Sequence, residues 1–216
     1  MGLISDNTNY DRAKTLREAS RLQAKGRIKK AITMYRRVLM REPDNAEIHA
    51  KIAPLLAKTR QYFDAWRSFR TAGGELVRID RLDHALGTYK EALRYLPHEI
   101  DAWRAVAEVE AKLDRKRDAV QTLLRGRRRF RARYLRPQAI SLLRRARQID
   151  PWHEQAVLEL ARLLAKTRQR EEAQLILHDL ASRSKGRKLR RVRGAQWRVS
   201  RTLQNTWLWL RAATVG

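Results

Sequence analysis

The sequence contains no cysteine and has only nine glycines and five prolines among its 216 residues. Without cysteine, the chain has no disulfide bonds and no thiolate metal sites. A composition poor in glycine and proline and rich in Ala, Leu, Arg and Glu favours helices, because strand-rich folds need many turns and β-branched residues. Apolar residues make up 43% of the chain, which is enough for a folded core and too much for a disordered polypeptide.

The sequence also lacks long apolar runs. No segment approaches the roughly 18 uncharged apolar residues that indicate a transmembrane helix. The first residues, MGLISDNTNYDRAK, contain no basic region followed by an apolar run and therefore do not predict a secretory signal. We expect a soluble protein located in the cytoplasm.

Acidic residues are scarce: 23 Asp and Glu stand against 49 Lys and Arg, which gives a net charge of +26. The imbalance is larger in the second half, where residues 101–216 hold 29 basic and 11 acidic side chains, against 20 and 12 in residues 1–100. An arginine-rich genome would explain arginine in place of lysine, but not the missing acids. Such a positive field attracts polyanions, which are nucleic acids, anionic lipids or acidic proteins.

Residues of the same type recur along the chain at a step of 54 residues. The step relates Pro43, Pro97 and Pro151, and the heptapeptide LLAKTRQ occurs at 55–61 and again at 163–169, two steps apart. So many matches in one register indicate a true internal repeat, and repeats determine the fold. Other positions related by the step are Ala31, Ala85 and Ala139; Tyr35, Tyr89 and Leu143; Ala53, Ala107 and Ala161; Lys58, Lys112 and Lys166; and Ala65, Ala119 and Ala173.

Each period contains a pattern of small and large residues that suits pairs of antiparallel helices. In residues 12–45 the pattern includes small Ala19, Gly26 at the turn between helices, and Pro43 at the end of the second helix. Small residues allow two helices to approach closely, large ones fill the groove between them, and proline ends a helix. The pattern resembles the tetratricopeptide repeat over about residues 12–183, and the chain is identified as a bacterial-type, arginine-rich member of that family. The resemblance implies an all-α, antiparallel helical-repeat solenoid and says little about the ligand.

The step of 54 residues differs from the usual tetratricopeptide period of about 34. The units are therefore expected to overlap, so that three helices make up each period and one of them is long. We favour continuous helices at 61–79 and 115–133. The alternative is that Gly73-Gly74 and Gly126 break these segments, because an internal glycine costs about 1 kcal/mol relative to alanine. The expected units cover residues 12–45, 46–79, 66–99, 100–133, 120–153 and 154–187.

Three segments lie outside the repeat array, which spans residues 12–183. Residues 1–11 are expected to form an N-terminal tail. Residues 184–194 are expected to form a basic connector that contains glycines. Residues 195–216 are expected to form a tryptophan-rich amphipathic segment.

This C-terminal segment has the spacing of an amphipathic helix. Leu203, Trp207 and Leu210 fall at i, i+4 and i+7 and therefore on one face, while Trp197 and Trp209 add two more large aromatic side chains. We expect the segment to cap the last repeat, because the end of a solenoid otherwise exposes apolar surface. The alternatives are docking of a partner or self-association, and contact with an anionic membrane surface.

No set of residues resembles a catalytic or metal site. The chain lacks the HExxH, GxxxxGK[ST] and GxSxG motifs, and its histidines are scattered without metal-ligand spacing. An active site needs convergent titratable groups, and the repeat offers none. We therefore predict that the protein is not an enzyme and binds no cofactor or metal. The five histidines are His49, His84, His98, His153 and His178.

Two basic clusters are candidate contacts for a polyanion or an acidic partner. Residues 125–136, RGRRRFRARYLR, interleave Phe130 and Tyr134 with arginines that could clamp phosphates while the rings stack on bases. The competing interpretation, which we favour, is that both rings face the core, because they fall one turn apart on the expected helix. The candidate contacts are Arg125, Arg127, Arg128, Arg129, Arg131 and Arg133 in the first cluster, and Arg183, Lys185, Arg187, Lys188, Arg190, Arg191 and Arg193 in the second.

The sequence therefore predicts an interaction scaffold that presents a basic surface to an acidic segment of a protein partner. The alternative is a basic helical-repeat protein associated with RNA, DNA or the ribosome. Some tetratricopeptide repeats grip a C-terminal carboxylate with Asn and Lys on their first helices. This clamp is not expected here, because no asparagine occupies the corresponding positions, which hold Ser20, Pro54, Glu108 and Arg162.

Overall fold

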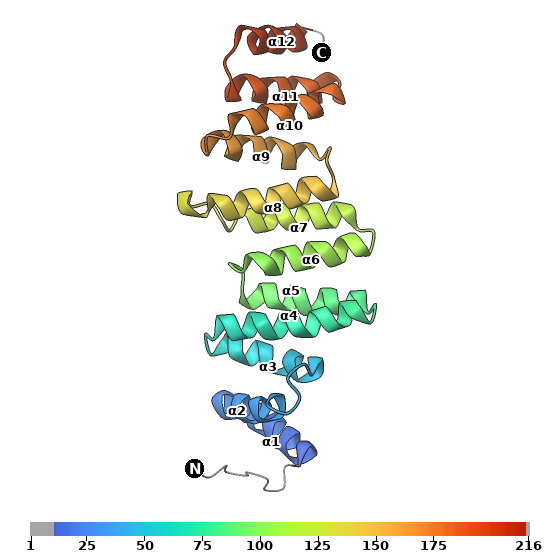
Figure 1. Ribbon diagram of the computed structural model, residues 1–216, viewed down its shortest axis with the longest axis vertical. Coiled ribbons are helices and arrows are strands. Elements are labelled where there is room, and N and C mark those ends of the chain that lie inside the picture. Colours follow the sequence, from blue (N-terminus) through green and yellow to red (C-terminus); the bar gives the residue numbers. More distant parts are fainter. Residues whose placement is uncertain (1–10, 215–216) are drawn as a thin grey trace, which may run out of the picture. The chain divides into compact units, whose positions relative to one another are not determined.

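The computed structural model describes residues 11–214, which form twelve α-helices and one short 3-10 helix and contain no strand (Figure 1). The all-α helical-repeat fold predicted from the sequence is confirmed. The expected N-terminal tail lies outside the described residues except for Asp11, whose side chain accepts a hydrogen bond from the backbone N–H of Lys14 and caps the first helix. The chain divides into two compact units, Met1–Ala102 and Trp103–Gly216.

In the first unit, consecutive helices pack against each other across short turns: α1 on α2, α3 on α4, and α4 on α5. Such short connections make neighbouring helices antiparallel. The helices of this unit are α1 (Arg12–Ala24), α2 (Ile28–Leu39), α3 (Ala46–Lys58), α4 (Tyr62–Arg78) and α5 (Leu82–Tyr95), and α6 (Ile100–Lys112) begins at its end.

The second unit continues the same pattern, with α7 on α8, α9 on α10, α10 on α11 and α11 on α12. In addition, α9 contacts α11 across the intervening helix. Its elements after α6 are α7 (Lys116–Arg127), the 3-10 helix η1 (Arg133–Leu135), α8 (Arg136–Ile149), α9 (Glu154–Lys166), α10 (Arg170–Ser182), α11 (Gly186–Val199) and α12 (Leu203–Thr214).

The core of each unit combines small residues with large ones at helical spacing. Ala31 and Tyr35, one turn apart on α2, are both buried. The alanines at equivalent places on three other helices, Ala53, Ala107 and Ala161, are at most 1% exposed. Buried alanines at these positions allow neighbouring helix backbones to approach closely, as the repeat pattern predicts.

Five helix ends carry a residue in the left-handed backbone region, with φ between 58° and 69°. Glycine adopts this conformation without strain, whereas a residue with a Cβ pays roughly 1 kcal/mol or more. These residues reverse the chain tightly between helices, and the predicted turn at Gly26 is confirmed. The five are Gly26, Arg60, Asp80, Asp114 and Arg168.

The repeated heptapeptide LLAKTRQ builds the same turn twice. Thr59 Oγ1 donates to the carbonyls at the end of α3, and Gln61 Nε2 donates to Thr59 Oγ1 at 2.7 Å. Thr167 and Gln169 make the same set of hydrogen bonds at the end of α9, with 2.9 Å between the amide nitrogen and the hydroxyl.

An arginine on the preceding helix fixes each of these turns. Arg36 on α2 donates to the glutamine of the first turn and forms an ion pair with Asp64 at 2.8 Å. Arg144 on α8 donates to the glutamine of the second turn and pairs with Glu172 at 2.7 Å. The heptapeptide is therefore conserved between the two turns because it ties three successive helices together.

Helix starts recur at the step that the sequence repeat predicts. The claim that three helices form one structural period nevertheless stays a prediction. The related starts are Ile28, Leu82 and Arg136; Ala46, Ile100 and Glu154; and Tyr62, Lys116 and Arg170.

The first of the two expected long helices is continuous, because α4 runs from Tyr62 to Arg78 through Gly73 and Gly74. Gly73 lies beneath the ring of Tyr89 on α5, where an added Cβ would come within 2.5 Å of the ring atoms. Glycine is therefore required at this position for a close helix contact, and it does not break the helix.

The second expected helix, 115–133, is continuous through Gly126 but ends at Arg127, so the prediction is wrong for its last residues. Phe130, three residues beyond the end of this helix, is buried in the core, with 5% of its surface exposed. Pro137 in the first turn of α8 lacks a backbone N–H and so starts a new helix.

The segment 184–194, expected as a basic connector, is largely helical. The helix α11 begins at Gly186 and continues to Val199, burying Val192 and Gln196 one turn apart. The expectation of a connector is wrong because arginine is a strong helix former and a surface helix needs only a narrow row of buried side chains.

Candidate functional site

A groove of about 550 Å³ lies between α9 and α11 in the second unit. Its floor is apolar, because both helices turn small or aliphatic side chains toward each other there. The two helices are in direct contact, although α10 separates them in the sequence. The floor consists of Leu158, Ala161 and Ala165 on α9 and Ala195 and Val199 on α11.

Three exposed cations line this groove. Arg162 and Lys166 lie one turn apart on α9, and Arg198 lies on α11. The Nε atom of Arg198 donates to the carbonyl of Gly194 at 3.0 Å, which anchors one side of the guanidinium and leaves its two terminal nitrogens available. Within residues 11–214, none of the three cations forms an ion pair.

Glu159 is the one acidic residue that lines the groove, and its charge is already compensated. Arg127 at the end of α7 places Nε 2.8 Å from Glu159 Oε2, and both side chains are about three-quarters buried. Gln155 donates to the other carboxylate oxygen at 3.2 Å. The groove therefore presents a net positive charge above an apolar floor.

The ion pair with Glu159 changes the role of Arg127, which the sequence analysis proposed as a partner contact. Its guanidinium pairs with an acid of the protein itself, so Arg127 has an intramolecular partner. Burial of both partners makes the pair sensitive to loss of either one, because the remaining charge would be left uncompensated.

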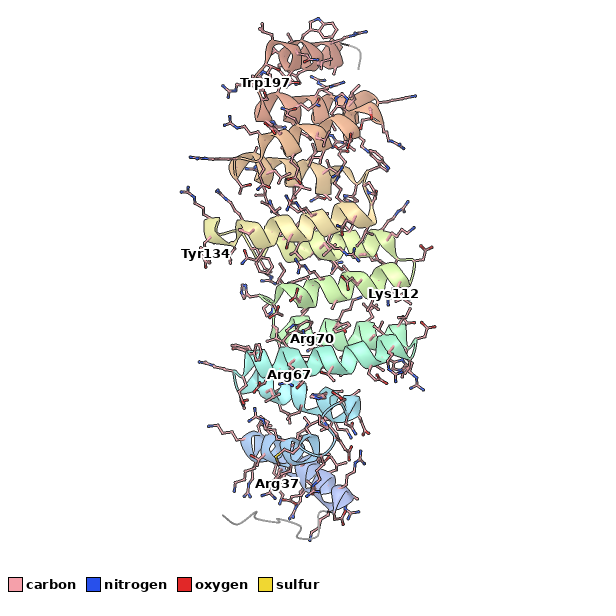
Figure 2. All side chains as sticks on the ribbon, in the orientation of Figure 1. Arg37, Arg67, Arg70, Lys112, Tyr134 and Trp197 are labelled. Carbon is pink, nitrogen blue, oxygen red and sulfur yellow. The ribbon has the colours of Figure 1, made fainter. Side chains whose placement is uncertain are left out.

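Of the other arginines of the first cluster, Arg125 lies in the last turn of α7 and the rest lie between α7 and α8. Phe130 is buried, but Tyr134 in η1 is 80% exposed, and Figure 2 shows it at the outer edge of the α7–α8 loop. The interpretation that both rings face the core is therefore correct for Phe130 and wrong for Tyr134, because the two do not share a helix. The exposed arginines are Arg125 at the end of α7 and Arg128, Arg129, Arg131 and Arg133 beyond it.

Part of the second cluster joins the end of α10 and the first half of α11 to the start of α9 and the turn before it. Arg183 stacks on the ring of Trp152 at 4.1 Å, and Lys188 Nζ donates to the Trp152 carbonyl at 3.3 Å. Arg191 forms an ion pair with Glu154 at 2.9 Å. These three predicted partner contacts thus have intramolecular partners.

The remaining members of the second cluster differ in exposure. Lys185, Arg187 and Arg190 are exposed and form no ion pair within the described chain. Arg193 is partly buried, which lowers the pKa of its guanidinium, and it donates to Gln196 at 2.9 Å.

The expected tryptophan-rich segment is not one helix: residues 195–199 end α11, and Leu203–Thr214 form α12, whose two faces have different roles. Trp209 stacks on Trp197 of α11, with ring centroids 5.6 Å apart. The predicted face of Leu203, Trp207 and Leu210 is formed, but all three side chains are more than half exposed. The helix α12 therefore covers α11 and at the same time exposes an apolar face of its own.

The groove residues Arg162, Lys166 and Arg198 were not among the predicted contacts. Lys166 belongs to the repeated heptapeptide, and Arg162 stands where other periods have Pro54 and Glu108. The appearance of a cation at a position that is not cationic elsewhere in the repeat is the signal that could have identified this site.

No histidine, aspartate and glutamate side chains within residues 11–214 come together as a group of three that could hold a metal ion. The groove has no nucleophile beside a base either, since its polar side chains are three cations and one paired carboxylate. The charged side chains that line the groove are therefore predominantly basic.

Short antiparallel helices that pack through buried alanines define an all-α helical-repeat protein. The profile of the family described as tetratricopeptide repeat matches residues 137–192, which cover most of α8, all of α9 and α10, and half of α11. Residues 137–192 are thus a tetratricopeptide-repeat segment, and the recognition made from the sequence is confirmed. Helical repeats of this kind serve as scaffolds for protein–protein interaction.

Two solved structures illustrate the similarity to known proteins. The chain is 16% identical to pilF of Pseudomonas aeruginosa, over 93% of this chain and 88% of that one, with a TM-score of 0.32. It is 11% identical to a tetratricopeptide-repeat protein of Bacteroides fragilis NCTC 9343, over 96% and 100% of the two chains, with a TM-score of 0.48. Similarities at this level carry no argument about function. Among proteins of curated function, no sequence matches the chain.

Proposed function

We propose that this protein is an interaction scaffold whose groove between α9 and α11 binds an acidic segment of a protein partner. One observation carries the proposal: Arg162, Lys166 and Arg198 surround an apolar floor, while the charge of Glu159 is cancelled by Arg127. A groove with three cations and no uncompensated acid attracts carboxylates and repels basic ligands.

The chemistry of the groove specifies the ligand further. An arginine guanidinium can bind a carboxylate with two parallel hydrogen bonds, whereas a lysine acts as a compact point charge. The side chains of Leu158 and Val199 offer apolar contact between these charges. The ligand that fits is a peptide in which Asp or Glu alternates with aliphatic residues.

The proposal is tested by fluorescence anisotropy with two labelled peptides of equal length and charge. One contains only Glu, and the other places Leu between acidic residues. Replacing Arg162 and Arg198 with Gln should weaken binding of the Leu-containing peptide by roughly tenfold or more, because each lost charge-assisted hydrogen bond has this magnitude.

The matched control removes the same amount of charge elsewhere on α11. Replacing Arg187 and Arg190 with Gln should change the affinity by no more than about twofold, since exposed charges outside a site contribute little to binding. Equal losses in the two double variants would contradict the proposal, because binding would then depend on net charge alone. Equal affinity for both peptides would remove the role of the apolar floor.

A second candidate function is binding of single-stranded nucleic acid by the α7–α8 loop. The observation that favours it is the exposed ring of Tyr134 beside four exposed arginines, since bases stack on such rings while phosphates pair with the cations. A labelled single-stranded RNA tests it: binding should weaken with salt at a log–log slope of about −0.7 per phosphate contact and should fall when Tyr134 is replaced by Ala.

A further inference from the structure

The outer face of α12 is apolar and exposed. Leu203, Trp207 and Leu210 have 91%, 56% and 52% of their surfaces exposed, and their spacing puts them on one side of the helix. Single exposed apolar residues are normal, but three large ones in a row indicate contact with an apolar partner or phase. These three residues are called the α12 stripe below.

The opposite face of α12 is fixed to α11. Trp209 stacks on Trp197 with 20° between the ring planes, and it lies so close to Gly194 that an added Cβ would be 3.2 Å from the indole nitrogen. Asn205 Nδ2 donates to the carbonyl of Ser200 at 2.9 Å. The α12 stripe therefore has a defined orientation, away from the face that packs on α11.

Arginines lie beside the aromatic rings of this region. Arg211 lies 5.2 Å from the centroid of the Trp207 ring, and Arg201 lies 5.1 Å from that of Trp197. Residues 181–216 contain ten basic residues and no acidic one, so no charge in the segment opposes an anionic surface. Apolar rings flanked by arginines are typical of helices in the headgroup region of a bilayer.

We propose that the α12 stripe inserts into the surface of an anionic bilayer, with Arg201 and Arg211 on the headgroup phosphates. This inference goes beyond the proposed scaffold function and does not depend on the groove. Stable attachment of a peripheral protein requires two signals, an apolar insertion and a polybasic segment. The stripe supplies the first, and exposed cations of residues 181–216 supply the second, among them Lys185, Arg187, Arg190 and Arg201.

The helix lies in the plane of the surface and does not cross it. Twelve residues give a length of about 18 Å, whereas spanning the hydrocarbon core takes about 20 residues. Within residues 11–214, no helix is both long and apolar enough to cross a bilayer.

The charges also argue against a second copy of this chain as the occupant. In a two-fold dimer each copy presents the same patch, so the basic C-terminal segments of the two copies would approach each other. No acidic residue in 181–216 compensates this repulsion. An anionic surface, in contrast, neutralises the arginines and buries the stripe at the same time.

The test is co-sedimentation of the full chain with vesicles of phosphatidylcholine alone and of phosphatidylcholine mixed with phosphatidylserine. The unmodified protein should bind the mixed vesicles and bind the neutral ones much more weakly. Replacing Leu203, Trp207 and Leu210 with Ser should lower the partition coefficient for the mixed vesicles by roughly tenfold or more, because binding scales with buried apolar area. These side chains are exposed, so the triple variant should fold.

Two controls separate the stripe from other causes. Replacing Phe63 on α4, which is 82% exposed, with Ser removes an exposed aromatic ring outside the stripe and should leave vesicle binding unchanged. Replacing Arg201 and Arg211 with Gln should reduce the preference for phosphatidylserine. The triple Ser variant should retain the binding of the Leu-containing acidic peptide, so this proposal and the scaffold proposal fail independently.

Three results would overturn the inference. The first is no binding to the mixed vesicles, and the second is full binding by the triple Ser variant, which would mean that basic charge alone suffices. The third is a dimer in sedimentation velocity that the triple Ser variant converts to a monomer without vesicles, which would identify a second copy as the occupant.

Discussion

Replacing Gly73 with Ala should destabilise the first unit although alanine is the better helix former. An added Cβ would lie 2.5 Å from Cε1 and Cζ of Tyr89, which is closer than van der Waals contact allows. The ring has little room to move, because Tyr89 is 6% exposed and its ring packs against Trp66 at 6.2 Å between centroids. Overpacking of this kind costs about 1–3 kcal/mol, against a gain of about 1 kcal/mol in helix propensity.

The adjacent glycine provides a matched control. Gly74 lies in the same helix and is exposed, and the nearest atom to its added Cβ is the Tyr89 hydroxyl oxygen at 4.0 Å. Gly74→Ala should therefore be stabilising by up to about 1 kcal/mol. Because the propensity gain is common to both variants, the difference between their free energies of unfolding, about 1–3 kcal/mol, isolates the contact with the ring.

The assay is urea unfolding followed by far-ultraviolet circular dichroism for both variants. A third variant, Tyr89→Leu, removes the ring, and in that background Gly73→Ala should cost less than in the unmodified protein. Equal unfolding midpoints for Gly73→Ala and Gly74→Ala would refute the reasoning, because glycine at 73 would then serve no packing purpose.

Two further predictions concern polar contacts. Thr122 Oγ1 donates a hydrogen bond to the buried carboxylate of Glu110 at 2.7 Å. Thr122→Val removes the donor and should lower the free energy of unfolding by about 1–3 kcal/mol. Thr122→Ser keeps the hydroxyl and should lower it by about 1 kcal/mol or less. The pKa of Glu42 is lowered, first by the hydrogen bond from Arg12 and then by that from Asn45. The ionised Glu42 carboxylate therefore stabilises the fold at a pH above the ordinary carboxyl pKa, and this stabilisation is lost as the pH falls through the lowered pKa. In Arg12→Gln, a carbon-detected NMR titration should show the pKa of Glu42 rising toward its ordinary value, and an unchanged titration would contradict the assignment.

Much of the fold could be predicted because the repeat is visible in the sequence. The buried alanines, the turn at Gly26 and the continuous helix through Gly73 all follow from residue type and spacing. The helical state of 186–199 could not be predicted in the same way, since its many arginines conceal the short buried row formed by Val192 and Gln196.

The candidate site was harder to predict because exposure depends on contacts between distant residues. Arg127 and Arg191 belong to the predicted clusters, but each meets a glutamate of α9, so neither is available for a partner. Tyr134 is exposed because the chain leaves the helix after Arg127. Counting charges along the sequence reveals neither effect.

The repeat determines the fold, and the places where the periods differ locate the site. Lys58 and Lys166 end helices of the same length before identical turns, so the repeat gives both the same backbone position. The residue one turn before Lys166 is Arg162, whereas the residue one turn before Lys58 is Pro54. In the middle period that place holds Glu108, an acid whose carboxylate lies 3.7 Å from an arginine of α8.

The proposed anion-binding groove therefore lies beside α9, where the periods differ in charge. Positions that pack helices stay apolar between periods, as at Tyr35, Tyr89 and Leu143, whereas exposed positions on the same helices can change charge at little cost in stability. Arg198, the third cation, lies in the second half of α11, beyond residue 192, where the match to the tetratricopeptide-repeat family ends. The groove therefore depends on two features together. Arg162 replaces a residue that is not basic in the other periods, and α11 follows the third period and adds Arg198. Neither of the first two periods has both features.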